Sequence, residues 1–350
     1  MMLMIMSIWM KVIGFTIEMG DTVGIIGNKN MKKQIDVAIA SAKQRNTAPP
    51  HMLFSGHAGC GKTSMAKEVS KILGGDFISV IPEDIKNQKT VLNLLDALNY
   101  EGYDNKGNRK NDIKPTVIFL DECHRLPMFG QEKLGIAMEN FTMETGQANK
   151  LFWLPYFTII GATTIAGELS KPFLDRFKLN FFFNPYDEKE SCSIVKYHAN
   201  KLEIDITNKA ILDVAIRGRG VPRVMLRYLE CCRDMMFAVN SKVITSGLSR
   251  ITFDNMRIDK KGFNIVELKI LKSLYNSDKA VGLETLSLIT GESAKTIKNE
   301  IETYLIRNEY MVRSGAGRSI TAKGRMYLEE QGYVGVKNGR ETITANYERY

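Results

Sequence analysis

The chain has 350 residues, of which 44% are hydrophobic and 25% charged, and only 9 are proline. This length predicts two or three domains, and the composition excludes a disordered, collagen-like or mucin-like chain. Lys and Arg number 48 against 39 Asp and Glu, a formal net charge of +9. That moderate excess favours a polyanionic partner such as nucleic acid.

The apolar run at residues 1–10 is too short to span a bilayer and stops at Lys11. It also lacks the basic start and the small-residue cleavage site of a signal peptide, and no other segment reaches transmembrane length. The 5 cysteines have neither paired CxxC nor Cys/His zinc spacing. We therefore expect reduced thiols, no membrane association and a cytoplasmic protein.

The first half of the chain alternates short apolar runs with helical patterns. Helices are predicted at 64–73 and 131–140, and residues 100–114, rich in Asn, Asp, Gly and Lys, read as an exposed loop insertion. The runs rich in β-branched and aromatic residues predict five buried strands, at 51–55, 77–81, 116–120, 157–161 and 179–183. Continuous apolar strands alternating with helices predict an α/β fold with a parallel sheet covered on both faces.

The apolar pattern changes from strand-like runs to helical spacing near Tyr186. It predicts helices throughout residues 187 to about 240 and a linker at 247–262. From Phe263 onward, apolar residues at helical spacing lead into a short flap around the glycine-bearing turn SGAGR at 314–318. Three helices followed by a two-stranded flap are the outline of a winged helix.

The strongest motif is GHAGCGKT at residues 56–63, which follows a predicted strand and precedes a predicted helix. It fits GxxxxGK[ST], in which glycines let successive backbone N–H groups point at a phosphate. Lys62 is expected to reach the β- and γ-phosphates of ATP, and the Thr63 hydroxyl to bind Mg²⁺. A glycine-rich turn without a ligand is the alternative, and the flanking elements argue against it. The predicted nucleotide contacts of this loop are Gly59, Cys60, Gly61, Lys62, Thr63 and Ser64.

The second motif is VIFLDE at residues 117–122, an apolar strand that ends in two carboxylates. We expect it beside the phosphate loop of a neighbouring strand. Asp121 would hold Mg²⁺, and Glu122 would orient and deprotonate the attacking water. Such a run is a weak signal alone and a strong one downstream of a phosphate loop.

Three further positions carry weaker signals. Thr164 closes the strand at 157–161 and its hydroxyl could sense the γ-phosphate, although a Thr at a strand end is usually a local cap. Arg176 in DRF and Arg223 in GVPR are candidate phosphate-facing cations. An isolated arginine is more often a solvated surface residue.

The order GHAGCGKT, LDECHR, GATT, DRF, GVPR resembles the AAA+ ATPases and, more narrowly, the RuvB family of Holliday-junction branch-migration motors. Residues 157–177 are similar to that family's sensor and arginine-finger region, and residues 217–234 to its sensor-2 helix. Residues 282–328 resemble its winged helix almost end to end. The resemblance covers about 26–328 and implies an AAA+ core at 1–185, a helical lid at 186–255, a winged-helix domain at 256–330 and a tail at 331–350.

The resemblance also implies roles for single residues. Thr164 matches sensor 1 and Arg223 matches sensor 2. Arg176 matches the arginine finger, which in such rings completes the site of the adjacent subunit and stabilises charge on the transferring phosphoryl group. Residues implied beside the adenine are Ile26, Gly27 and Tyr186. The implied device is a homo-oligomer, a hexameric ring around duplex DNA that hydrolyses ATP at its subunit boundaries during recombination and repair.

Basic residues cluster around the SGAGR turn, opposed locally only by Glu309. A basic wing with small residues at its tip can approach phosphates closely and without sequence preference, although a solvated basic hairpin is the alternative. We expect Arg313 and Arg318 to contact double-stranded or branched DNA. Arg318 is the first choice because it occupies the family's wing-arginine position.

Some residues depart from the family pattern. The family's additional arginines after GATT and before DRF are replaced by Ile165 and Leu174, so Arg176 alone must serve as the finger. Residues 143–154 are several residues shorter than the family's RuvA-contacting hairpin, which weakens the expectation of a RuvA-like loading partner.

Two other functions fit part of the pattern. A clamp loader or helicase loader shares the nucleotide motifs, but a clamp loader usually carries a helical collar where this chain predicts a winged helix. A DNA-binding scaffold without turnover would not need Lys62, Thr63, Asp121, Glu122 and Arg176 together. The sequence therefore favours an ATP-dependent DNA motor.

Overall fold

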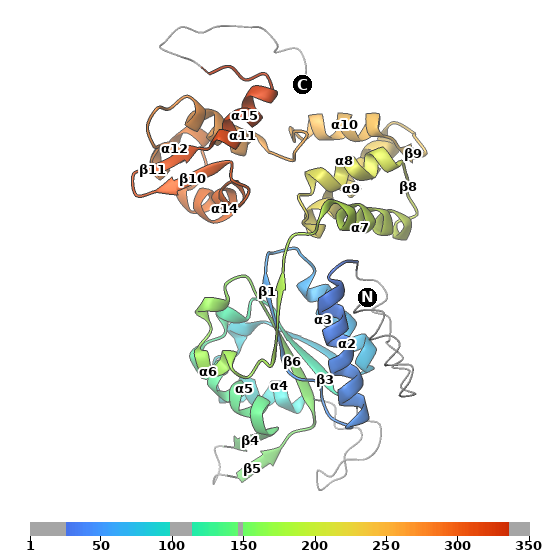
Figure 1. Ribbon diagram of the computed structural model, residues 1–350. Coiled ribbons are helices and arrows are strands. Elements are labelled where there is room, and N and C mark those ends of the chain that lie inside the picture. Colours follow the sequence, from blue (N-terminus) through green and yellow to red (C-terminus); the bar gives the residue numbers. More distant parts are fainter. Residues whose placement is uncertain (1–25, 99–113, 146–149, 336–350) are drawn as a thin grey trace, which may run out of the picture. The chain divides into compact units, whose positions relative to one another are not determined.

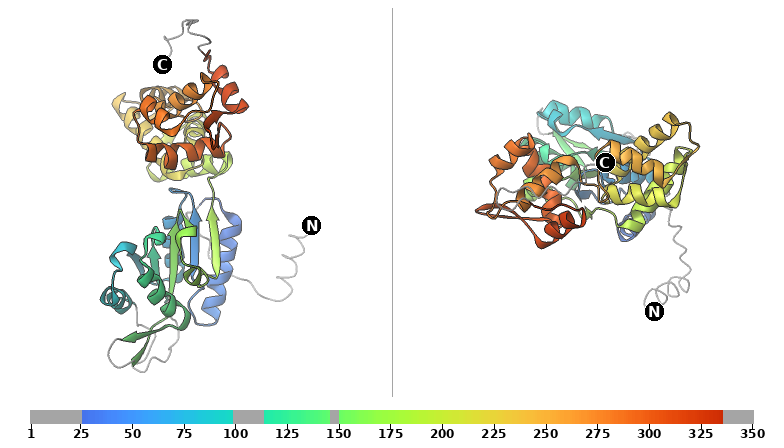
Figure 2. Two further views of the ribbon diagram at one scale, coloured as in Figure 1. Left: turned by 90° about the vertical axis from the view of Figure 1, so that its left-hand side faces the viewer. Right: turned by 90° about the horizontal axis from the view of Figure 1, so that it is seen from above.

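The computed structural model describes residues 26–98, 114–145 and 150–335 (Figures 1 and 2). The chain divides into two compact units. The first runs to Ile194 and includes residues 220–224, and the second contains residues 195–219 and those from 225 onward. The Met-rich start, nearly all of the expected 100–114 insertion and most of the tail lie outside the described residues. Within the described ranges, no helix is both long enough and apolar enough to cross a bilayer.

Parallel strands form the centre of the first unit, in the order β2, β3, β6, β1, β7. They are β1 (Met52–Gly56), β2 (Phe77–Val80), β3 (Thr116–Leu120), β6 (Phe157–Thr163) and β7 (Leu179–Phe183). All five coincide with the predicted strands to within two residues at each end. β3 and β6 are buried along their whole length, which explains their uninterrupted apolar sequences.

Helices cover both faces of this sheet (Figure 1). On one side lie α2 (Lys29–Gln44) and α3 (Lys62–Leu73), and on the other α4 (Gln88–Asp96), α5 (Met128–Asn140) and the single turn α6 (Lys171–Leu174). Alternate strand residues enter different cores: Phe54 packs in the cluster of α2 and α3, and Leu53 in that of α4 and α5. A short antiparallel hairpin, β4 (Thr142–Thr145) with β5 (Lys150–Trp153), follows α5.

The helical lid contains α8 (Asn208–Arg217), α9 (Pro222–Ala238) and α10 (Ser246–Asn255), preceded by α7 (Glu188–Lys201). Two-residue strands β8 (Asp205–Ile206) and β9 (Val243–Ile244) pair in parallel. The expectation of a linker at 247–262 is wrong over its first half, because that stretch belongs to α10. The Thr245 hydroxyl caps this helix by accepting the Leu248 N–H at 3.3 Å, and Phe253 buries its side chain against Tyr228.

The C-terminal part is the predicted winged helix. It contains α11 (Ile265–Tyr275), α12 (Leu283–Thr290), α13 (Ala294–Thr296), a π-helical turn (Ile297–Ile301), α14 (Glu302–Arg307), β10 (Met311–Ser314), β11 (Gly317–Ile320) and α15 (Ala322–Glu330). Its core gathers around Phe263, Leu274, Leu305 and Tyr327. Val281 adds one antiparallel bridge to Arg318, so the flap is anchored to the chain before α12.

Candidate active site

The loop between β1 and α3 is shaped by glycines in left-handed conformations. Gly56, Gly59 and Gly61 have φ values of 118°, 77° and 94°. A Cβ at Gly59 would lie 2.9 Å from Cβ of Arg223 and 3.0 Å from Cγ1 of Val221, so a side chain there would collide as well as strain the backbone. The first N–H groups of α3 lack acceptors within the helix, and an anion is their natural partner.

Lys62 places its ammonium inside this loop. Its Nζ donates to the carbonyl oxygens of Gly56 at 2.8 Å and His57 at 2.9 Å, and the residue is only 7% exposed. Burial lowers the pKa of Lys62, while the carboxylates of Glu122 and Asp121 act in the opposite direction. The structure therefore places the predicted lysine where a bound phosphate would meet a poorly solvated cation.

Tyr186 lies between the phosphate loop and the chain before α2. Its hydroxyl donates to the Cys60 carbonyl at 3.4 Å and accepts from Nδ2 of Asn28 at 3.0 Å. Burial raises the pKa of Tyr186 to about 12, so the phenol remains protonated. Gly27 has a φ of 78°, and a Cβ there would lie 2.7 Å from Cε1 of Tyr186. The predicted Gly27 and Tyr186 are thus brought together, with Ile26 next in the chain.

Asn28 is a site residue that the sequence analysis missed. It precedes α2 with a φ of 52°, and its side chain bonds to Tyr186 instead of capping the helix. An Asn directly before a helix predicts an ordinary N-cap. The sequence pattern therefore gives no sign of the long-range contact with Tyr186.

The segment Gly220–Arg223, hereafter the GVPR segment, packs on the same loop. The Gly220 carbonyl accepts the Tyr186 N–H at 2.8 Å, and the Arg223 N–H donates to the Gly59 carbonyl at 3.3 Å. Gly220 has a φ of 73°, and a Cβ there would lie 2.4 Å from the Tyr186 carbonyl oxygen. The backbone of the predicted sensor-2 arginine is thereby fixed to the phosphate loop, while its side chain is exposed.

The paired carboxylates follow β3, at the same edge of the sheet as the phosphate loop. The expectation that β3 neighbours β1 is wrong, because β6 lies between them. That order brings the end of β6 next to the carboxylates. Oε2 of Glu122 accepts from the backbone N–H of Thr164 at 3.2 Å and from its hydroxyl at 3.1 Å. Asp121 is exposed, and its Oδ1 accepts the Glu122 N–H at 3.1 Å.

His124 is a second residue that sequence reasoning did not select. Its Nδ1 lies 3.3 Å from Oε2 of Glu122 and 3.0 Å from the hydroxyl of the buried Thr163. Glu122 itself has a left-handed backbone with a φ of 48°, a costly conformation for a residue with a side chain. The Glu122 carboxylate is therefore held against the end of β6 from two sides.

Arg176 has a partner within its own chain. Its Nη2 lies 2.7 Å from Oε2 of Glu139 on α5, and its side chain is 33% exposed. Glu139 is separated from Arg176 in the chain by the β4–β5 hairpin, β6 and α6, so no local pattern indicates this pairing. The pairing fixes Arg176 beside α5 while leaving part of its side chain accessible.

The wing differs from the expectation at Arg318. Nε of Arg318 donates to Oε1 of Glu302 at 2.6 Å, and these side chains are only 10% and 2% exposed. Its guanidinium thus neutralises a buried carboxylate instead of standing on the surface. Arg313, opposite Arg318 in the β10–β11 ladder, is exposed and remains the candidate DNA contact.

These features define a P-loop ATPase of the AAA+ class with a helical lid and a winged-helix domain. The model of the Holliday junction DNA helicase RuvB P-loop domain matches residues 21–182, that of the RuvB AAA lid domain residues 186–259, and that of the RuvB C-terminal winged helix domain residues 260–329. The chain belongs to the RuvB family.

Individual relatives match along most of their length. The Holliday junction branch migration complex subunit RuvB of Campylobacter jejuni (strain RM1221) is 34% identical over 313 residues, covering 87% of this chain and 89% of the relative. The corresponding subunit of Wolbachia sp. subsp. Brugia malayi is 32% identical, covering 87% and 91%. Among solved structures, the Thermotoga maritima RuvB Holliday junction branch migration motor has a TM-score of 0.71 and 30% identity, covering 87% of this chain and 95% of that one.

The burial of Arg318 gives opposite expectations for the two wing arginines. Arg318→Ala should destabilise the winged helix by about 3–5 kcal/mol, because Glu302 would stay buried without its counter-charge. Arg313→Ala should leave stability within about 0.5 kcal/mol of wild type. It should weaken duplex binding and reduce the slope of log K against log salt concentration by about 1.

Urea denaturation and fluorescence anisotropy over a salt series measure the two effects. The opposite outcome would contradict this assignment: Arg318→Ala keeps normal stability and loses the salt-dependent DNA contact, while Arg313→Ala keeps that contact. Arg318 would then be the residue that binds DNA.

Proposed function

We propose that this protein is the ATP-driven motor of Holliday-junction branch migration, assembling as a hexameric ring that translocates the duplex arms of a junction. The observation that carries the proposal is the glutamate Glu122 held by Thr164 beside an intact phosphate loop, in a chain that also contains a winged helix. The relatives named above are branch migration complex subunits, and the chain covers nearly all of their length.

The nucleotide roles follow from the site. Lys62 and the loop from Gly59 to Ser64 would bind the phosphates, and Tyr186 with Gly27 and Ile26 would border the base. Arg223, whose backbone is fixed on Gly59, would present its exposed side chain to the phosphates as sensor 2.

The Thr63 hydroxyl and the exposed Asp121 carboxylate are hard oxygen ligands of the kind Mg²⁺ prefers. When bound, Mg²⁺ neutralises charge on the phosphate oxygens.

Glu122 would orient the attacking water and accept its proton. Thr164 and His124 hold the carboxylate through Oε2, so its other oxygen is available to the water. Thr164 also stands at the predicted sensor position. A change at the γ-phosphate that moved Thr164 would therefore move the Glu122 carboxylate, which is hydrogen-bonded to it.

Arg176 would act in trans. Its own chain offers it Glu139 as a partner, and in a ring the partly exposed guanidinium would reach the phosphates of the adjacent subunit. Hydrolysis would then require assembly. A RuvA-like loading partner would dock on the β4–β5 hairpin, which exists here as two four-residue strands.

The proposed motor is tested by measuring ATP turnover without DNA, with linear duplex and with a four-way junction, while following junction dissociation. We expect DNA to stimulate turnover and dissociation to require ATP. Glu122→Gln should bind ATP and assemble but lose about 10²–10⁴-fold in turnover, because the water loses its base. Stimulation that appears only when a sliding clamp or a second helicase is added would instead indicate a loader.

The trans role of Arg176 is tested by complementation. Arg176→Ala and Glu122→Gln should each be inactive alone, since a trans-acting arginine finger contributes about 10³–10⁵-fold. Mixed rings should regain single-turnover hydrolysis, because a Glu122→Gln subunit still donates its finger to an Arg176→Ala neighbour with an intact base. Mixtures that stay inactive at every ratio, despite forming rings, would place the finger in cis.

A further inference from the structure

Arg219 occupies an unusual position in the second unit. It follows α8, directly precedes the GVPR segment and has a left-handed backbone with a φ of 53°. Such a backbone is strained for a residue with a side chain, and strain of this kind persists only where the surroundings enforce it. The Arg219 side chain is 14% exposed, so its charge is largely removed from water.

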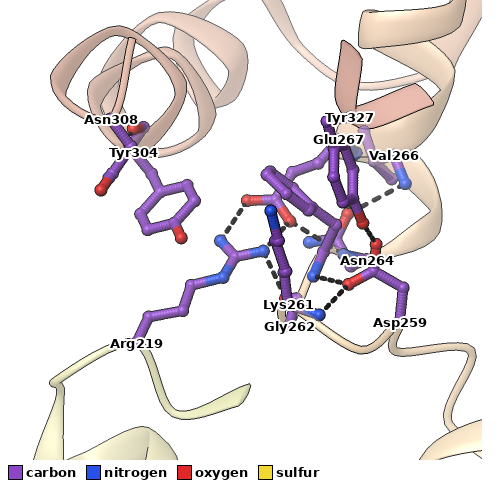
Figure 3. A network of polar contacts seen from close by, with 11 residues as sticks. Arg219, Asp259, Lys261, Gly262, Asn264, Val266, Glu267, Tyr304, Asn308 and Tyr327 are labelled. Atoms are coloured by element: carbon purple, nitrogen blue, oxygen red, sulfur yellow. Dashed lines mark hydrogen bonds and ion pairs between the residues drawn. The ribbon is translucent and has the colours of Figure 1, made fainter. Parts of the chain in front are cut away.

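The winged-helix domain supplies the partners of this guanidinium (Figure 3). Nη1 and Nη2 donate to Oε1 and Oε2 of Glu267 on α11, each at 2.7 Å, and Nη2 also donates to the Gly262 carbonyl. The guanidinium carbon lies 3.8 Å from the ring centroid of Tyr304 on α14 and 4.7 Å from that of Phe263. A two-pronged ion pair and stacking on aromatic rings both require the planar fork of arginine, which lysine does not provide.

Glu267 is itself fixed by the start of α11. Its Oε2 accepts the Asn264 N–H at 2.8 Å, while Oδ1 of Asn264 accepts the Glu267 N–H at 2.9 Å, forming a capping box. The chain leading into this helix is also fixed, because Oδ1 of Asp259 accepts the Phe263 N–H at 2.8 Å. Arg219 is therefore attached to a rigid corner of the winged helix.

The residues on the other side of the Arg219–Gly220 peptide bond belong to the nucleotide site. Gly220 is bonded to Tyr186, and Arg223 to Gly59 of the phosphate loop. Neither glycine accepts a Cβ without a collision below 3.0 Å. One peptide bond thus joins a residue fixed on the winged helix to a segment fixed on the phosphate loop.

We infer that Arg219 is a positioning residue that transmits rearrangements of the ATP site to the winged helix. A displacement of the GVPR segment moves the Arg219 backbone, and the ion pair and aromatic contacts carry that motion into α11 and α14. This inference rests on the proposed function, since it assigns the coupling between hydrolysis and DNA movement to a single side chain.

The test uses Arg219→Ala, Arg219→Lys and Glu267→Gln in the full chain. Glu267→Gln keeps a side chain that can complete the capping box but removes the charge that pairs with Arg219. Arg227→Ala is the matched control, because Arg227 is an exposed lid arginine over the ring of Tyr228, with a guanidinium-to-centroid distance of 5.2 Å. It removes an arginine–tyrosine contact that lies within the lid helix α9.

The first readout is hydrogen exchange of α11 and α14 with and without a non-hydrolysable ATP analogue. In wild type and Arg227→Ala, the analogue should change exchange at the start of α11. The three test variants should bind the analogue normally and lose that response. An ATP response that survives in Arg219→Ala, or its absence from wild type while the analogue binds, would overturn the inference.

The second readout is ATP turnover, with KM and kcat determined separately with and without duplex. Loss of the coupling should reduce DNA stimulation of kcat about 5-fold or more, with DNA-free kcat and KM nearly unchanged. Equal losses with and without DNA would show that Arg219 only supports folding and would overturn the inference. If wild type binds ATP but DNA does not stimulate its turnover, the proposed motor function is wrong. The hydrogen-exchange readout still decides the role of Arg219 in that case.

Discussion

The nucleotide site depends on a tight packing arrangement in which the GVPR segment lies against the phosphate loop. The loop can curl around an anion only because its glycines adopt left-handed conformations. It stays curled because Gly59 bonds to the backbone of Arg223 with no space between them for a methyl group. Tyr186 completes the arrangement by bonding to both the loop and Gly220. The backbone of Arg223, the predicted sensor 2, is consequently packed together with the phosphate loop as one rigid unit.

The charged groups of the site are likewise each bonded to a neighbouring residue. Lys62 is turned onto the carbonyls of its own loop, Glu122 is held by Thr164 and His124, and Arg176 is paired with Glu139. Glu122 is therefore oriented before any ligand arrives, which reduces the reorganisation that hydrolysis requires. Lys62 and Arg176 must instead exchange their present partners before either can contact a phosphate. The strained backbone of Glu122 indicates that the surrounding contacts enforce this arrangement.

Sequence reasoning succeeded where the physical signal is local. Buried parallel strands are continuous apolar runs, and a phosphate loop needs glycines and a lysine at fixed spacing. The sheet and the positions of Lys62 and Glu122 at its edge could therefore be predicted, while the roles of these residues in hydrolysis stay predictions. It failed over α10, because that helix buries Ser249 and Thr252 beside Phe253 and so has too few apolar residues to stand out.

The partners of the predicted residues could not be read from the sequence. Arg318 looked like a surface cation because nothing in the local pattern shows that Glu302 is buried beside it. Glu139 and Arg219 likewise acquire their roles from residues distant in the chain. The family resemblance supplied roles for motif positions, whereas the tertiary structure determined which charges are free.

The most direct test of the packing of GVPR on the phosphate loop compares the ATP affinities of Gly59→Ala and Gly74→Ala. Both glycines have left-handed backbones, with φ values of 77° and 69°, so both substitutions impose similar strain. A Cβ at Gly74 meets nothing within 4 Å, whereas one at Gly59 collides with Val221 and Arg223. We predict that Gly59→Ala weakens ATP binding by at least about 10-fold, roughly 1.4 kcal/mol, with little change in Gly74→Ala. Equal ATP affinity in the two variants would contradict the account.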